Sequence, residues 1–316
     1  MTASRFEAPS TVSEQARRFL AADTAAQPPL PPAEAHDAWD ALIRGTNAYI
    51  AKLSAGAAAL PVTVDRQDIA GVSVAVAEPD GIETDGPVYL DFHGGALIYG
   101  GGDLLDLTVA TTAAGAGMTT WAPDYRMPPK HPYPAGLDDA VAVYRALLQV
   151  KAPNEIVVGG ASAGGNIAAA LVLRAKAEGL PLPAALVLLS PEVDLTESGD
   201  SFTVLNGVDN VLSPLMDINL LYAAGASLTD PFVSPLFGDL HDFPPTLLQS
   251  GTRDLFLSNT VLMHRKLRQA GVYAQLHIFE AMPHGGFGGA PEDLEIKREV
   301  RGFLRGHLPV AETAVR

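Results

Sequence analysis

The sequence predicts an α/β fold with a mostly parallel central sheet flanked by helices and a helical cap. Three observations indicate this fold. Short apolar runs of strand length alternate with segments of helical periodicity over most of the chain. Two of the expected helices end at a glycine, Gly179 and Gly271, as helices commonly do. One stretch, Leu195–Pro231, is longer than an ordinary connection and interrupts the alternation. Strands that alternate with helices imply parallel strands joined by crossover helices.

Length and composition restrict the class of protein. The chain has 316 residues, enough for one α/β domain with a small appendage. With 47% hydrophobic and 18% charged residues, it has the composition of a folded globular protein. The formal net charge of −15, without a cluster of Lys or Arg, argues against nucleic-acid binding. Cysteine is absent, which excludes disulfides and thiol catalysis.

The beginning of the chain bears on its location. The first ten residues, MTASRFEAPS, contain no apolar stretch of signal-peptide length. No segment reaches the roughly 18 uninterrupted apolar residues of a membrane-spanning helix. We therefore expect a cytoplasmic protein without a membrane span.

Residues 1–60 are rich in Ala and Pro. Helical stretches near Val12–Ala22 and Ala35–Leu53 are separated by the proline-containing run Pro28–Pro32. We expect this segment to form the N-terminal part of the helical cap.

Residues 61–194 alternate between the two kinds of element, and we expect them to form the first part of the core. The expected strands are Val72–Val76, Pro87–Phe92, Met118–Ala122, Ile156–Val158 and Ala185–Leu189. The expected helices are Leu137–Gln149 and Asn166–Glu178. The second helix is followed by Gly179 and Pro181, which is a normal C-terminal signal.

Residues 195–231 are expected to form a cap insertion, with helical pieces around Leu215–Ala223. The alternation returns in residues 232–316, which we expect to complete the core. Its expected elements are the strand Thr246–Gln249, the helix Ser258–Ala270, the strand Tyr273–Phe279 and a helix from about Pro291 to Leu304.

A candidate nucleophile lies between a strand and a helix. Residues 160–164 read GASAG, which matches the pattern G-x-S-x-G, and they follow the strand Ile156–Val158 and open an Ala-rich helix. A sharp turn at this place needs neighbours without bulk and leaves the hydroxyl of Ser162 exposed at a helix N-terminus. The alternative is a glycine-rich turn in which the serine only caps the helix. The strand-to-helix context favours the nucleophile.

A serine nucleophile needs a base, and the base needs an acid that orients it. In folds with this elbow the chain order is Ser, Asp, His. Asp254 follows the strand Thr246–Gln249, and His284 follows the strand Tyr273–Phe279. Separately, Asp254 could cap the next helix and His284 could belong to an ordinary loop, but their order and strand-end positions favour a triad. The other histidines considered lie in helical, terminal, strand or distant loop segments: His36, His241, His264, His277 and His307.

A second glycine-rich turn follows the strand Pro87–Phe92. It begins His93-Gly94-Gly95-Ala96 and resembles the HGGG element whose amides complete an oxyanion hole. The expected donors are the backbone N–H groups of Gly94, Gly95 and Ala96, together with that of Ala163. The alternative is an ordinary glycine turn after a strand.

With these residues in place, the chain resembles the bacterial hormone-sensitive-lipase-like esterases, family IV of the α/β-hydrolases, from about Pro87 to Pro309. Residues 124–135, DYRMPPKHPYPA, resemble the family's DYRLAPEHPFPA element, and residues 190–196, SPEVDLT, resemble its SPxxDLT segment. The resemblance implies an α/β-hydrolase fold and a cap that covers the acyl and alcohol pockets. It implies hydrolysis of short to medium acyl esters without a metal or an organic cofactor.

The same resemblance assigns roles to individual residues. It makes Ser162 the nucleophile, His284 the general acid and base, and Asp254 the carboxylate that orients the histidine. Oxyanion donors would come from the amides of Gly94, Gly95, Ala96 and Ala163.

Three positions depart from the family pattern. Ala96 replaces the third glycine of the oxyanion turn, Ala161 stands where the family commonly has Asp, and Glu192 stands where a bulky aromatic residue is frequent. Glu192 could bring a carboxylate near the substrate pocket. The alternatives are that it is solvated or paired with an arginine.

The sequence leaves other functions open. A lactone or amide hydrolase would use the same acyl-enzyme chemistry, because only the pocket differs. A non-catalytic small-molecule receptor on this scaffold would be expected to have lost a triad residue, and all three are present. The spacing of the histidines gives no support to a metal-dependent hydrolase. Exposed sheet edges would allow a homodimer.

Overall fold

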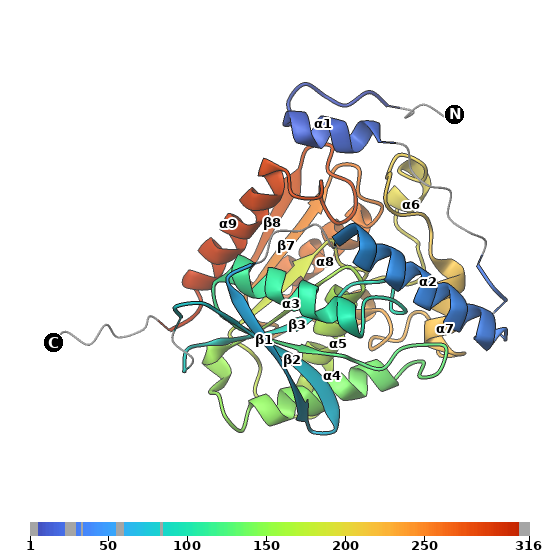
Figure 1. Cartoon of the computed structure of the whole chain (residues 1–316). Helices are drawn as coiled ribbons and strands as arrows, with labels where there is room; N and C mark the ends of the chain where they lie inside the picture. Colours follow the sequence, from blue (N-terminus) through green and yellow to red (C-terminus); the bar gives the residue numbers. More distant parts are fainter. Residues whose placement is uncertain (1–5, 23–29, 33, 55–59, 83–84, 310–316) are drawn as a thin grey trace.

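The structure is a computed structural model that describes residues 6–22, 30–32, 34–54, 60–82 and 85–309. Eight strands form one sheet in the order β1-β2-β4-β3-β5-β6-β7-β8 (Figure 1). The strands are β1 (Val62–Ile69), β2 (Val72–Pro79), β3 (Val88–Phe92), β4 (Thr119–Pro123), β5 (Ile156–Ala161), β6 (Ala185–Leu189), β7 (Thr246–Gly251) and β8 (Ala274–Phe279).

Only the β1 end of the sheet is antiparallel. Strand β1 pairs antiparallel with β2, and β2 pairs antiparallel with β4, whereas every other neighbouring pair is parallel. The predicted mostly parallel sheet is confirmed. Strand β1 was not predicted, and its residues alternate between half-buried and exposed along most of its length. Such a half-covered edge strand has a weaker apolar signal than the buried strands of the centre.

The helices largely follow the predicted segments. They are α1 (Glu14–Ala21), α2 (His36–Ser54), α3 (Asp103–Ala116), α4 (Ala135–Leu147), α5 (Ala163–Ala177), α6 (Ser201–Val204), α7 (Met216–Ala223), α8 (Leu257–Gln269) and α9 (Pro291–Arg305). Helix α3 was not predicted. Its sequence, DLLDLTVATTAAGA, mixes apolar residues with threonines around the whole helix, so it lacks a clear helical stripe.

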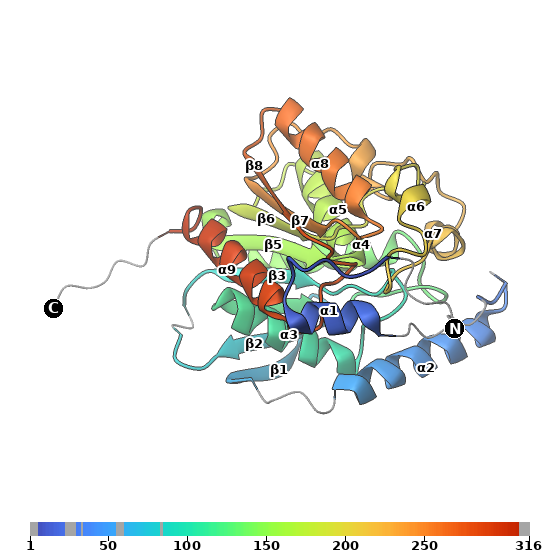
Figure 2. The ribbon, with the colours of Figure 1, turned by 90° about the horizontal axis from the view of Figure 1, so that it is seen from above.

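The helices cover both faces of the sheet (Figure 2). Helices α4, α5 and α8 contribute to the largest apolar core, on one face. Helices α3 and α9 cover the other face, where they pack on smaller apolar clusters. Helix α5 lies against the central strands, and almost all of its residues are buried. The fold therefore fixes the start of α5 at the middle of the sheet.

The two N-terminal helices cover different parts of the molecule (Figure 1). Helix α1 packs against Ala281, Met282 and Phe287, close to the end of the chain's last strand. The side chain of Ser13 caps α1 and also donates a 2.8 Å hydrogen bond to Glu292. Helix α2 instead packs through the buried Trp39 on residues of the insertion after β6. The division into a cap (residues 1–60 and 195–231) and a core stays a prediction.

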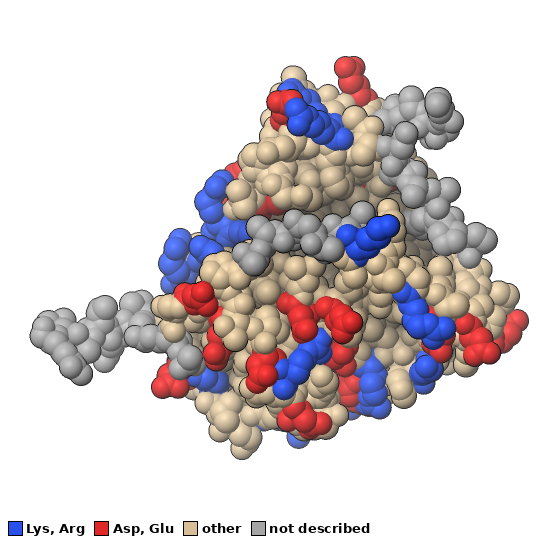
Figure 3. All heavy atoms as spheres, in the orientation of Figure 1, with Lys and Arg blue, Asp and Glu red and all other residues tan. Residues whose placement is uncertain are grey.

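Among the described residues, no helix is long and apolar enough to cross a membrane. On the face shown in Figure 3, Lys and Arg side chains are interspersed with Asp and Glu. Arg66 of β1 forms ion pairs with Asp106 at 2.7 Å and with Asp124 at 3.4 Å.

Candidate active site

Ser162 lies at the turn between β5 and α5. Its backbone has φ +57° and ψ −122°, a conformation that costs a non-glycine residue about 1–3 kcal/mol. The surrounding structure holds this conformation, since the amide of Ser162 donates a 2.9 Å hydrogen bond to the carbonyl of Leu189 in β6. The carbonyl of Ser162 also accepts a hydrogen bond of 2.9 Å from the amide of Gly165. The turn is therefore a strained elbow that presents the serine hydroxyl.

The glycines around Ser162 are required by packing. A Cβ atom on Gly164 would overlap the carbonyl oxygen of Phe92, at the end of β3. A Cβ atom on Gly160 would overlap the backbone of Gly164, and one on Gly165 would stand 2.7 Å from the Cβ atom of Pro191. Close approach of three backbone segments thus explains why these positions carry no side chain.

Ser162, His284 and Asp254 form one chain of hydrogen bonds. The Oγ atom of Ser162 lies 2.9 Å from Nε2 of His284, and Nδ1 of His284 lies 3.0 Å from Oδ1 of Asp254. A carboxylate only accepts hydrogen bonds, so Nδ1 carries the proton and Nε2 is free to accept from the serine. His284 is 8% exposed and Asp254 is fully buried. The three residues that the sequence predicted are thus brought together in the geometry of a serine nucleophile and its base.

The environment keeps Asp254 ionised. Its carboxylate accepts hydrogen bonds from the hydroxyl of Ser250 (2.6 Å) and from the amide of Phe256 (2.9 Å). Burial acts to raise the pKa of Asp254, but the adjacent His284 and hydrogen bonds from two serines, Ser250 and Ser190, outweigh it and lower the pKa. A charged Asp254 can therefore orient the imidazole and stabilise its protonated form.

The pKa of His284 is raised above its ordinary value. Burial acts to lower this pKa, but the charge and hydrogen bond of Asp254, followed by the charges of Asp209 and Glu192, outweigh the burial. The ring of Phe256 packs edge-on against the imidazole, with 4.8 Å between ring centroids. The hydrogen bond to Asp254 and the contact with Phe256 thus fix the position of the His284 ring.

The predicted oxyanion turn lies beside the elbow. A Cβ atom on Gly94 would stand 3.0 Å from the carbonyl oxygen of Ala161, so this turn and the elbow are in close contact. Gly95 and Ala96 both have positive φ, of +125° and +50°. Ala163 opens α5 directly after the serine. These residues therefore lie around the elbow, next to the serine.

A histidine fixes the start of this turn. His93 is buried and stacks on the ring of Tyr125, with 4.2 Å between ring centroids. The hydroxyl of Tyr125 donates a 2.8 Å hydrogen bond to the carbonyl of His93. Tyr125 belongs to the DYRMPPKHPYPA segment, so this segment supports the oxyanion turn from behind.

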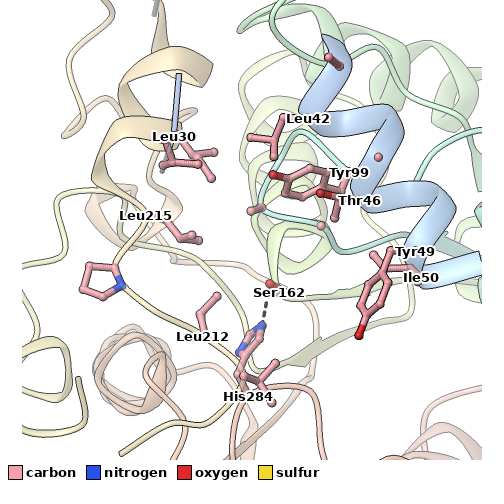
Figure 4. A pocket seen from close by; sticks show the side chains of 17 residues that line it. Leu30, Leu42, Thr46, Tyr49, Ile50, Tyr99, Ser162, Leu212, Leu215 and His284 are labelled. Carbon is pink, nitrogen blue, oxygen red and sulfur yellow. Dashed lines mark hydrogen bonds between the residues drawn. The ribbon is translucent and has the colours of Figure 1, made fainter. Parts of the chain in front are cut away.

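A pocket of about 830 Å³ opens above Ser162 (Figure 4). Gly95, Ala96, Ser162 and His284 line its floor. The N-terminal segment contributes Leu30, Ala41, Leu42, Gly45, Thr46, Tyr49 and Ile50, and the insertion after β6 contributes Val211, Leu212, Pro214, Leu215 and Ile218. Tyr99, in the segment between β3 and α3, completes the lining. Most of these side chains are apolar, so the pocket favours an uncharged ligand.

Comparisons with known proteins agree with this geometry. The family model described as alpha/beta hydrolase fold matches residues 89–287. An esterase of Acinetobacter venetianus is 34% identical over 194 residues, which are 60% of this chain and 64% of that protein. The carboxylesterase NlhH of Mycobacterium tuberculosis is 30% identical over 239 residues, 71% of this chain and 73% of the relative.

Solved structures extend the match to nearly the whole chain. The crystal structure of an esterase named E25 has a TM-score of 0.88 and 35% identity, and the match covers 98% of both chains. An esterase from the bacterial hormone-sensitive lipase family has a TM-score of 0.79 and 29% identity, covering 94% of this chain and 99% of the other. The chain belongs to the hormone-sensitive-lipase-like esterases of the α/β-hydrolase fold. It is a carboxylic ester hydrolase.

Glu192 lies close to the pocket of this esterase but does not line it. It is not among the residues that line the pocket, and it is only 1% exposed. Its amide donates a 3.0 Å hydrogen bond to the carbonyl of Ser162, so the residue lies behind the elbow. Within the described part of the chain, neither carboxyl oxygen has a hydrogen-bond partner, and burial raises its pKa to about 8. Glu192 is therefore neither solvated nor paired with an arginine, and its burial favours the protonated form.

Several residues at this esterase site could not be found by sequence reasoning. Asp209, a buried carboxylate of the insertion, contacts the loops of both Asp254 and His284. Tyr99 and Tyr49 line the pocket from segments far apart in the chain. Asp209 lies in the stretch Asn206-Gly207-Val208-Asp209, which looks like an ordinary turn, and no local pattern distinguishes it. No group of three or more His, Cys, Asp or Glu side chains is placed to hold a metal ion in the described ranges.

Proposed function

We propose that this esterase is a serine carboxylesterase that hydrolyses short to medium acyl esters through an acyl-serine intermediate. The observation that carries the proposal is the continuous hydrogen-bonded chain from Ser162 through His284 to Asp254. It gives the hydroxyl a base, and it gives the base a buried counter-charge. These roles for the three residues, and the oxyanion role of Gly94, Gly95, Ala96 and Ala163, are part of the proposal.

Acylation follows from this arrangement. His284 Nε2 takes the proton of Ser162 as Oγ bonds to the ester carbonyl carbon, and the carbonyl oxygen becomes an oxyanion. The amides of the oxyanion turn and of Ala163 stabilise that charge. The imidazolium then gives its proton to the leaving alkoxide as the C–O bond breaks. An alcohol leaves, and the acyl group stays on Ser162.

Deacylation repeats these steps with water. His284 takes a proton from a water molecule as its oxygen attacks the acyl carbon. The oxyanion forms again at the same amides and collapses, breaking the bond to Oγ. The histidine returns its proton to the serine, and the carboxylic acid is released.

The pocket supports an acyl ester as the substrate. Its cap side is built from leucine, isoleucine, valine and tyrosine side chains, which favour an apolar acyl chain and disfavour a charged one. Its volume of about 830 Å³ is large enough for a medium acyl chain together with the alcohol group. A lactone or an amide would use the same steps, so a substrate panel must decide between these reactions.

The test is hydrolysis of p-nitrophenyl esters from acetate to dodecanoate, of lactones and of anilides, by wild type and Ser162→Ala. We expect ester hydrolysis in wild type and a loss of about 10⁴-fold or more in the variant. Intact mass spectrometry should show one fluorophosphonate adduct on wild type and none on Ser162→Ala. Ser227→Ala, at an exposed serine of the insertion, is the matched control and should behave as wild type.

Two results would contradict the proposal. Retained hydrolysis in Ser162→Ala would show that another group is the nucleophile. Absence of both hydrolysis and adduct in wild type would favour a non-catalytic receptor. A cytoplasmic location and a homodimer stay predictions, which cell fractionation and light scattering can test.

A further inference from the structure

A buried carboxylate of the insertion contacts both loops that carry the triad. Asp209 lies between β6 and β7, and its side chain is only 6% exposed. Its Oδ2 atom accepts a 2.8 Å hydrogen bond from the amide of Leu255, the residue after Asp254. The same oxygen lies 3.3 Å from the amide of His284, which donates to it.

The other carboxylate oxygen of Asp209 is hydrogen-bonded to two residues of the pocket wall. Oδ1 accepts hydrogen bonds from the amides of Val211 (2.9 Å) and Leu212 (3.1 Å). Both of these residues line the pocket above Ser162. One side chain therefore joins three stretches of backbone: a turn of the pocket wall, the loop of the triad acid and the loop of the histidine.

We propose that Asp209 is a positioning residue that couples the insertion to the triad, fixing the backbone of His284 and adding a second negative charge beside its imidazole. This inference rests on the proposed role of Ser162, His284 and Asp254.

Four donors converge on this side chain, and only a carboxylate can serve all of them. Each carboxylate oxygen accepts two hydrogen bonds, whereas an asparagine has one accepting oxygen and an NH₂ group that itself donates. In Asp209→Asn the NH₂ group would face two backbone N–H groups. Buried amides without an acceptor are costly, so the loops would shift to relieve the conflict.

The charge of Asp209 acts on His284 together with two other acids. The titratable groups that face the imidazole are Asp254, Asp209 and Glu192. Burial raises the pKa of Glu192 to about 8, which disfavours its charged form at neutral pH. Burial raises the pKa of Asp209, while the hydrogen bonds from the amides of Leu255 and Val211 and the nearby His284 act to lower it. In its charged form Asp209 favours, together with Asp254, the imidazolium formed during the reaction. Removing the charge of Asp209 lowers the pKa of His284.

The experiment compares Asp209→Asn with wild type on p-nitrophenyl butyrate from pH 5 to pH 9. The base must be unprotonated, so the acidic limb of kcat/KM follows the pKa of His284. We expect this limb to move to lower pH by about 0.5 unit. We expect kcat at its plateau to fall by about tenfold with less than a twofold change in KM, since the defect lies in the histidine.

Two further variants separate the effect of the Asp209 charge on His284 from the effect of its hydrogen bonds to the loops. Asp217→Asn removes an exposed carboxylate of the same insertion, on α7, and should change neither the limb nor kcat. Asp209→Glu keeps the charge but is one methylene longer, so the limb should stay in place while kcat falls several-fold. If Asp209→Asn does not fold, as judged by circular dichroism, Asp209→Glu carries the test through its kcat.

Three outcomes overturn the inference. They are an unmoved acidic limb in Asp209→Asn, an unchanged kcat in Asp209→Asn, and an unchanged kcat in Asp209→Glu. The Ser162→Ala variant shows whether the proposed role of Asp209 or the proposed triad is wrong. If hydrolysis depends on Ser162 but the limb does not move, only the role of Asp209 is wrong; if Ser162→Ala keeps hydrolysis, the triad itself is wrong.

Discussion

The floor of the pocket above Ser162 and the wall opposite it are held by different kinds of contact. The floor belongs to the sheet edge, where hydrogen bonds of 2.9–3.0 Å and left-handed backbone fix Ser162, His284 and the oxyanion turn. The opposite wall belongs to α2 and the insertion, whose apolar side chains make contacts without direction. Some of them are well exposed, including Tyr49 at 58% and Ile50 at 38%. The positions of Ser162 and His284 on the floor are thus tightly determined, whereas the apolar side chains of the opposite wall can adapt to different ligands.

This difference predicts that small changes on the floor have large effects and large changes on the opposite wall have small ones. Among the changes that compare the two sides of the pocket, we expect the largest loss of kcat from Gly95→Ala, which adds one methyl group to the floor. Its Cβ would overlap the carbonyl of Tyr99, and φ at this position is +125°. The oxyanion amides would have to move, and losing one such donor costs about 10²–10³ in kcat. Steady-state kinetics on p-nitrophenyl butyrate measures this loss.

The matched control for Gly95→Ala is Gly71→Ala in the β1–β2 turn. Gly71 also has a positive φ, of +81°, but a Cβ there would meet nothing within 4 Å. We expect this control to lower the melting temperature by backbone strain and to leave kcat unchanged. Wild-type kcat in Gly95→Ala would show that the turn does not hold the oxyanion.

A smaller effect is expected on the opposite wall, where Tyr49→Ala removes a whole aromatic ring. The ring contributes apolar contact to the pocket, worth about 1 kcal/mol to a long acyl chain. We expect kcat/KM to fall about fivefold for an octanoyl ester and less than twofold for an acetyl ester. Tyr273→Ala, at another exposed tyrosine just before β8, should change neither value. An equal loss on both esters would contradict a role in acyl binding.

The smallest effect on activity is expected from Glu192→Gln, because glutamine has nearly the same size and shape as the glutamate next to the elbow. The pKa of Glu192 in the folded protein is about 8, above its ordinary value of 4.5. Between these values the folded state keeps a proton that the unfolded state has lost, so wild type loses stability as pH rises. Glutamine does not titrate, and we expect the variant to gain stability relative to wild type as pH rises from 5 to 8.5.

Thermal unfolding at pH 5 and pH 8.5 checks the prediction for Glu192→Gln. The advantage of the variant should be larger at the higher pH, and kcat at pH 7 should stay within twofold of wild type. Glu280→Gln, at an exposed glutamate, is the control for a change of net charge. An advantage that is the same at both pH values would show that Glu192 is ionised in the folded protein.

Much of the sheet and of the proposed triad could be predicted because their signals are local. Ile156–Val158 and Ala185–Leu189 are buried apolar runs, and each appears as a strand of the expected place and direction. Strand β1 and helix α3 were missed because β1 is half-covered at the sheet edge and α3 has no apolar stripe. The burial of Glu192 could not be predicted, because neighbouring residues do not show which side chain of a turn points into the protein.

By itself, the sequence determined the order of the strands along the chain, the glycine-flanked elbow and the residues that meet at the carboxyl edge of the sheet. It could do so because parallel strands end at one edge, and because a sharp elbow admits only glycine at its closest contacts. Only the tertiary structure decided that Asp209 reaches both triad loops, that α2 faces the insertion across the pocket, and that Glu192 is buried. These contacts join residues far apart in the chain, and packing, which has no local sequence signal, determines them.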